Sequence, residues 1–171
     1  MTMAHAGLAI AMFGFVGSSA WKSEEIVFVQ PGSVIEIAGF DVRFDGVERV
    51  RGPNYFADRG TLTVSWEGEL VTTLYPERRS YPVAQSRTTE SAIRSTLAGD
   101  LYASLAEPAS EAASDQGAWT LRILYEPLVF FIWMGSIMMI FGGGLSLSDR
   151  RLRVGAPRRA IKSKIVATPA E

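Results

Sequence analysis

The chain has 171 residues, no cysteine and one histidine, and its 17 basic and 18 acidic side chains leave a formal net charge of −1 at pH 7. Without cysteine it cannot form a disulfide-stabilised fold, a cysteine zinc site or a thiol nucleophile. A single histidine excludes multi-histidine metal sites, and it excludes a Ser-His-Asp triad except around His5.

The first predicted element is an apolar helix over residues 1–20, in which residues 2–20 contain no acid, lysine or arginine. Small residues recur along one side of it, and such a face lets a second transmembrane helix approach closely. They are Gly7, Ala11, Gly14 and Ser18. Two alternatives remain open: a plain lipid-facing anchor, and a secretory signal peptide, although a signal peptide normally has a basic n-region that is missing here.

His5 lies inside this apolar segment. An ionisable side chain within a membrane span is costly and usually faces a partner, a cavity or a metal. Imidazole is also a common axial ligand of haem iron. The alternative is that His5, so near the first residue, lies at the membrane interface without a function. One histidine does not specify iron, so the residues alone leave both interpretations open.

Residues 21–127 have the texture of a β domain, and a stretch of about this length can bury a core of its own. Short runs rich in β-branched and aromatic residues alternate with turn signals. The predicted strands cover residues 26–29, 34–37, 40–44, 47–50, 61–66, 70–75, 101–105 and 119–125. This spacing predicts a small antiparallel barrel or sandwich.

Other segments of the domain are less regular. Thr88 or Thr89 can cap a short helix that ends by Gly99, and residues 109–117 are small and polar, which is typical of an exposed loop. The neighbouring acids Glu24 and Glu25 fall at a strand start and are interpreted as solvated charges rather than a glycosidase pair.

Arg78 and Arg79 lie near Tyr75 and Tyr81 in the sequence. Arginine recognises carboxylates and phosphates through paired hydrogen bonds, so this cluster could bind an anion or a haem propionate. An exposed strand end is the competing interpretation.

Residues 128–147 form a second apolar segment with no charged residue and no histidine. As an α-helix it would cover about 30 Å, the thickness of a bilayer's hydrocarbon core. Residues 148–171 contain seven bases and two acids, so the positive-inside rule places this tail in the cytoplasm. The N-terminus is then cytoplasmic as well, and residues 21–127, with sixteen acids and ten bases, face outward. The sequence thus predicts two transmembrane α-helices flanking a small antiparallel β domain.

An ordered set of short motifs runs through nearly the whole chain. They are AHAG at residues 4–7, FDGV at 44–47, GPNY at 52–55, YPERRSY at 75–81, TE at 89–90, DLY at 100–102, GAW at 117–119 and DRR at 149–151. With these motifs the chain resembles the C-terminal portion of CcmF, the large membrane subunit of the cytochrome c haem lyase in bacterial and plant-mitochondrial maturation, and its relative NrfE.

The resemblance implies a role in cytochrome c maturation. In this family, the complex takes haem from a periplasmic haem chaperone and joins its vinyl groups to the two thiols of a CxxCH motif in apocytochrome c. A separate b-type haem in the membrane is held by two transmembrane histidines. His5 resembles the second of these by its AHxG context, which implies that it is an axial ligand of haem b iron. The other ligand must then lie outside this chain.

The resemblance also implies location and partners. The chain is expected in the bacterial inner membrane, with the β domain in the periplasm. The implied partners are the rest of the haem lyase subunit, the haem chaperone, the thioredoxin-like and apocytochrome-binding maturation subunits and apocytochrome c, with no nucleic acid.

The family's tryptophan-rich haem-handling segment and periplasmic histidines have no counterpart here, so the chain looks like a fragment or a split-gene product. We expect no catalytic residue in it and no haem ligation by it alone. The alternatives are a membrane-anchored β-domain scaffold or interaction protein without haem, and an exported β-domain protein with a cleaved leader.

Overall fold

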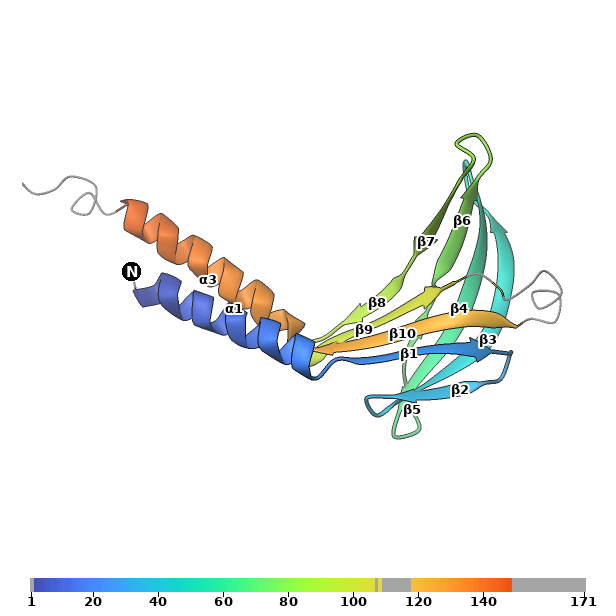
Figure 1. Cartoon of the computed structure of the whole chain (residues 1–171), viewed down its shortest axis with the longest axis horizontal. Coiled ribbons are helices and arrows are strands. Elements are labelled where there is room, and N and C mark those ends of the chain that lie inside the picture. Colours follow the sequence, from blue (N-terminus) through green and yellow to red (C-terminus); the bar gives the residue numbers. More distant parts are fainter. Residues whose placement is uncertain (1, 107, 109–117, 149–171) are drawn as a thin grey trace, which may run out of the picture.

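The computed structural model describes residues 2–106, 108 and 118–148. Two long helices lie side by side and extend from one end of an antiparallel β domain (Figure 1). The helices are α1 (Thr2–Ala20) and α3 (Val129–Ser148). Both are long and apolar enough to cross a membrane, judged by length and composition. The predicted loop at residues 109–117 and the basic tail from residue 149 onward lie outside the described residues.

The β domain is built from two antiparallel sheets that face each other. The four-stranded sheet has the order β1-β10-β9-β8. Its strands are β1 (Ser23–Val29), β8 (Ala92–Ser95), β9 (Gly99–Leu105) and β10 (Trp119–Pro127). The six-stranded sheet has the order β2-β3-β4-β6-β7. Strand β5 also pairs with β4, along a different part of that strand from β6. The strands of this sheet are β2 (Val34–Ile37), β3 (Phe40–Arg51), β4 (Phe56–Trp66), β5 (Glu69–Leu74), β6 (Glu77–Tyr81) and β7 (Ser86–Glu90).

The core lies between the two sheets and is filled by alternate residues of the central strands. Phe44 and Leu62 are directly paired on β3 and β4 and are fully buried. Leu121 and Leu105 are paired in the same way on β10 and β9. Burial of each such side chain contributes roughly 1.5–3 kcal/mol to folding. The predicted two-helix, antiparallel β architecture is therefore confirmed, in its sandwich form.

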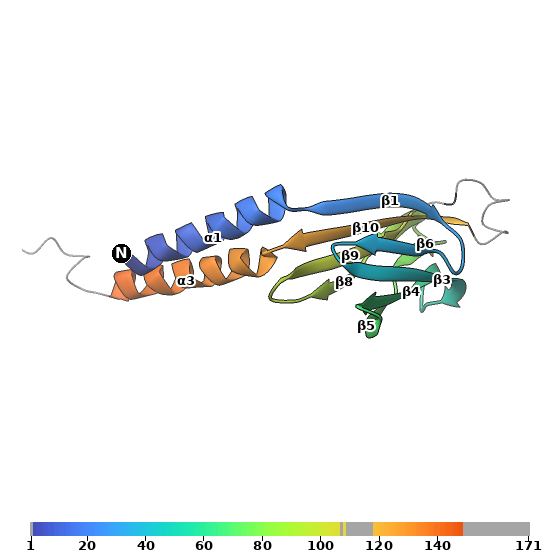
Figure 2. The same ribbon diagram turned by 90° about the horizontal axis from the view of Figure 1, so that it is seen from below.

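The helices continue two neighbouring strands of the four-stranded sheet (Figure 2). Ser23, at the start of β1, is paired with Tyr125, near the end of β10. At the start of α3, the N–H of Leu128 donates a hydrogen bond to the carbonyl of Ala98, at 3.0 Å. Because only a few residues join each helix to its strand, the helix pair and the sheet are closely coupled.

Two predictions about local structure are wrong. The helix expected between Thr88 and Gly99 does not form, since this segment contributes β7 and β8 instead. Thr88 is paired with Arg79 on β6, and Ile93 with Tyr102 on β9. Strand partners were available at both sheet edges, and long-range pairing outweighs a weak local cap signal.

The break expected between the predicted strands 40–44 and 47–50 is the second error. Residues 40–44 and 47–50 belong to one strand, β3, and the register shifts between Phe44 and Gly46 in a β-bulge. Gly46 has a φ of +136°, a conformation that favours glycine. The Asp45 carboxylate accepts hydrogen bonds from Arg43 at 2.7 Å and Thr63 at 2.5 Å, which ties the bulge to β4.

Candidate functional site

The helix pair is held together by backbone contact between glycines. A Cβ added at Gly7 would lie 2.7 Å from the carbonyl oxygen of Gly135 and 2.8 Å from the nitrogen of Met139. A Cβ at Gly142 would lie 2.7 Å from the nitrogen of Ala4. Such close approach requires small residues on both helices. The predicted small-residue face on α1 is confirmed, whereas its glycine partners on α3 were not identified from the sequence.

His5 lies outside this interface, on an exposed flank of α1. It lines a shallow apolar hollow of about 230 Å³ together with Ala4, Leu8 and Met139. A neutral imidazole can donate a nitrogen ligand to haem iron, and the apolar surroundings suit the edge of a porphyrin. The sequence contains no second histidine, and the described residues hold no group of three or more potential metal ligands. This flank therefore supplies at most one half of a bis-histidine site.

The predicted arginine pair lies on β6, and its two members have different neighbours. Arg79 binds the buried Glu77 carboxylate at 2.8 Å and stacks over the ring of Tyr55, at 4.6 Å from its centroid. Arg78 lines a cavity of about 100 Å³ with Arg49, Asp58, Arg79, Ser80 and Arg87. Both arginines of the pair therefore line this small polar cavity, whereas Tyr75 is not part of its lining.

Glu77 is the centre of an ion-pair network on the six-stranded sheet. Its carboxylate oxygens accept hydrogen bonds from Arg59 at 2.7 Å and from Arg79 at 2.8 Å. Burial raises the pKa of Glu77, but the hydrogen bonds and charges of Arg79 and Arg59 outweigh it, so the pKa lies below its ordinary value. The network is structural, because the charges of Glu77, Arg59 and Arg79 pair with one another within the domain.

Glu24 is similarly paired. It lies 2.9 Å from Lys22 and 2.7 Å from Arg122, and hydrogen bonds from these two bases lower the pKa of its carboxyl group. Glu24, which was interpreted from the sequence as a solvated charge, is thus ion-paired on the strand surface, and both of its partners are bases.

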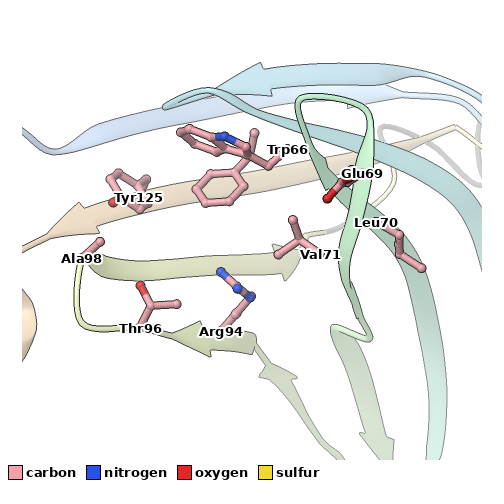
Figure 3. Close-up of a pocket in the computed structure, with 9 residues that line it drawn as sticks. Trp66, Glu69, Leu70, Val71, Arg94, Thr96, Ala98 and Tyr125 are labelled. Atoms are coloured by element: carbon pink, nitrogen blue, oxygen red, sulfur yellow. The ribbon is translucent and has the colours of Figure 1, made fainter.

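A larger pocket opens between the two sheets at the end of the domain that adjoins the helices. It has a volume of about 410 Å³ and combines an aromatic wall with one base and one acid (Figure 3). Its lining residues are Phe40, Trp66, Glu69, Leu70, Val71, Arg94, Thr96, Ala98 and Tyr125. No local sequence pattern marks this pocket, because its walls come from segments as far apart as β3 and β10.

Comparison with known proteins places these features in a wider context. The family model described as "CcmF C-terminal beta-sandwich" matches residues 20–127. The protein "Cytochrome c-type biogenesis protein CycK" of Bradyrhizobium diazoefficiens is 43% identical over 169 residues, which cover 99% of this chain and 25% of that protein. "Cytochrome c-type biogenesis protein CcmF" of Pseudomonas aeruginosa is 38% identical over 159 residues, covering 93% and 23%.

A solved structure shares the fold. The protein described as "Cytochrome c Heme Lyase CcmF" superposes with a TM-score of 0.64 at 20% identity, over 82% of this chain and 23% of that chain. The chain therefore spans about a quarter of the length of the relatives that it matches.

Proposed function

Because the chain belongs to the CcmF family of cytochrome c-type biogenesis proteins, we propose that it forms the C-terminal part of a cytochrome c haem lyase subunit. In this role it would act in the covalent attachment of haem to the CxxCH motif of apocytochrome c. The observation that carries the proposal is the 43% identity to a cytochrome c biogenesis protein over 99% of the chain, which includes both helices and the β domain.

We propose that residues 1–20 and 128–147 cross the bacterial inner membrane, with residues 21–127 in the periplasm and residues 148–171 in the cytoplasm. Helices of 19 and 20 residues are about 30 Å long, which matches the hydrocarbon core. Both helices leave the same end of the β domain, so one domain on one side of the bilayer is compatible with two spans. The excess of bases after residue 148 supports the orientation.

His5 is proposed as one axial ligand of a b-type haem. Its position on an exposed flank, beside an apolar hollow, supports a ligand that meets a second helix from outside this chain. When bound, such a haem would supply a one-electron carrier that helps to keep the substrate haem iron reduced. Within this chain, His5 would hold the iron from one side, and Leu8 and Met139 would exclude water from the porphyrin edge.

The β domain is proposed to support the lyase fold and to contact maturation partners. These partners would be the rest of the subunit, the haem chaperone, the thioredoxin-like and apocytochrome-binding subunits and apocytochrome c. Strands β1 and β10 pair with each other, and each is continuous with one of the two helices. This supports the role, because a displacement of the domain on partner binding would be passed directly to the membrane segments.

The ligand assignment can be tested by co-expression. The chain is expressed with the upstream portion of the Bradyrhizobium diazoefficiens relative, and the purified complex is examined for the reduced absorption bands of a b-type haem. We expect His5→Ala to abolish these bands, because the iron loses one of its two ligands. We expect added imidazole to restore them in the His5→Gly variant.

Met12→Ala is the matched control, because it shortens an exposed side chain of the same helix that does not line the hollow. The control should retain the bands. A spectrum that is unchanged in His5→Ala would refute the ligand role and favour a scaffold without haem. The absence of bands in the unmodified complex would refute the b-type haem.

A further inference from the structure

The pocket next to the helices contains a base and an acid that are both without a partner. Within the described part of the chain, the side chain of Arg94 makes no hydrogen bond, ion pair or ring contact, and the same holds for the side chain of Glu69. By contrast, Arg43, Arg59 and Arg122 each bind a carboxylate at 2.7 Å. Unpaired charges beside an apolar wall are costly unless a ligand or solvent compensates them.

Arg94 points to the inner side of the sandwich. It is paired with Leu101 on β9, and Leu101 is paired with Tyr125 on β10, so the three side chains lie in a row on one face of the sheet. Leu101 is fully buried in the core, while Arg94 stands at the edge of the same face and lines the pocket. A guanidinium group held there can bind a phosphate through paired hydrogen bonds.

The aromatic wall is built into the fold. A Cβ added at Gly39 would lie 2.9 Å from the indole of Trp66, so the ring rests directly on the backbone of that glycine. The ring of Phe40 meets the indole edge-to-face at a centroid distance of 4.8 Å. Trp66 nevertheless remains 43% exposed, toward the pocket. An indole face beside a carboxylate is a recognised way to bind an ammonium group.

The pocket also has a fixed position relative to the helices. Ala98 lies at one end of it, and its carbonyl accepts the hydrogen bond of Leu128, where α3 begins. Glu69 and Leu70 lie at the far end (Figure 3). Two exposed apolar side chains lie close to the helix ends in the sequence: Trp21 directly follows α1, and Leu97 precedes Ala98. Tryptophan is enriched at the membrane interface.

We propose that this pocket binds the headgroup of a zwitterionic phospholipid from the surrounding bilayer. Arg94 binds the phosphate, while Glu69 and the face of Trp66 receive the ammonium group further from the membrane. A headgroup of this kind offers one negative and one positive charge, which complements the two unpaired side chains. The proposal rests on the proposed membrane crossing of α1 and α3, since that crossing brings phospholipid headgroups to the level of Ala98.

The first test uses the soluble headgroup. The full chain in a nonionic detergent is titrated with glycerophosphoethanolamine while tryptophan fluorescence is recorded. We expect a saturable change that is absent in Trp66→Phe. Arg94→Gln should weaken binding at least tenfold, as expected for loss of a charge-assisted hydrogen bond. Glu69→Gln should also weaken binding.

Two control variants change the same charges elsewhere. Glu67→Gln alters the same turn but not the pocket lining, and Arg122→Gln alters an arginine of the same sheet that is paired with Glu24. Both should bind as the unmodified chain does. No saturable change, or equal weakening by the controls, would overturn the proposal. Binding of inorganic phosphate as tightly as the headgroup would overturn it too, because the ammonium site would then contribute nothing.

The second test uses lipid nanodiscs that contain equal amounts of phosphatidylethanolamine and phosphatidylglycerol. Lipids that remain bound to the chain are identified by native mass spectrometry. We expect phosphatidylethanolamine to be enriched, and the enrichment to be lost in Arg94→Gln but not in Arg122→Gln. Equal retention of both lipids would overturn the proposal. A chain that fails to enter nanodiscs would refute the membrane crossing, whereas the soluble titration would still decide whether the pocket binds the headgroup.

Discussion

Gly135→Val is expected to force α1 and α3 apart and to destabilise the helix pair by about 3 kcal/mol, as overpacking against a rigid neighbour does. A Cβ at position 135 would collide with the backbone of Gly7 and Ala11, and neither can yield without moving the helix. The chain has no cysteine, so an introduced pair at positions 13 and 131 can report the helix separation. The rings of Phe13 and Phe131 meet edge-to-face at a centroid distance of 5.7 Å, so the side chains at these positions face each other across the helix pair.

The measurement is the yield of the disulfide between these two introduced cysteines under mild oxidation, in detergent and in nanodiscs. Gly143→Val is the matched control, because nothing lies within 4 Å of a Cβ at that position on the same helix. We expect a large loss of cross-linking in Gly135→Val and an unchanged yield in Gly143→Val. Equal yields in both variants would show that the glycine contact does not hold the helices together.

Glu77→Ala is expected to destabilise the β domain by roughly 2–3 kcal/mol, the loss that follows when one partner of a buried ion pair is removed. The side chain of Glu77 is 9% exposed, and it separates the guanidinium groups of Arg59 and Arg79. Without the Glu77 carboxylate, the positive charges of Arg59 and Arg79 lose the negative charge that pairs with both of them. Urea unfolding, followed by tryptophan fluorescence of the full chain in micelles, measures the change.

Glu48→Ala is the control for that loss. Glu48 lies 3.9 Å from Arg59, and its side chain is 65% exposed, so its removal should change stability by less than about 1 kcal/mol. A similar loss of stability in both variants would show that the burial of Glu77 does not strengthen its ion pairs.

The same network predicts a dependence of stability on pH. Because the pKa of Glu77 in the folded domain lies below its ordinary value of 4.5, its contribution is fully present above pH 4.5. The contribution is lost as the pH falls through the lowered pKa of the folded state. Glu77→Gln should therefore flatten the acid side of the stability curve, and an unchanged slope would contradict the ion-pair assignment.

Much of the architecture could be predicted from local sequence. The two apolar segments and most strands follow from composition and turn residues, because lipid-compatible length and alternating burial leave a direct mark on the sequence. His5 could be singled out because it is an ionisable residue within an apolar stretch. Its proposed ligand role needs a partner outside this chain.

Other features were fixed only by contacts between distant segments. β7 and β8 replaced a predicted helix because β6 and β9 offered free edges. Strand β3 continues through the bulge at Gly46, because β4 pairs with it on both sides of the bulge. The glycines of α3 allow close helix packing only because the backbone of α1 lies directly against them.

Local sequence was enough to predict the two apolar helices, the β character of the domain between them and the small-residue face of α1, since each depends on residues close together in the chain. Which charges are paired depends instead on contacts between distant strands. Arg79 forms an ion pair with Glu77, whereas Arg94 and Glu69 lie beside an aromatic wall that is formed by residues of β3, β4 and β10. The physical reason is that an ion pair needs its atoms within about 4 Å, a spacing that strand pairing and sheet packing fix and composition does not.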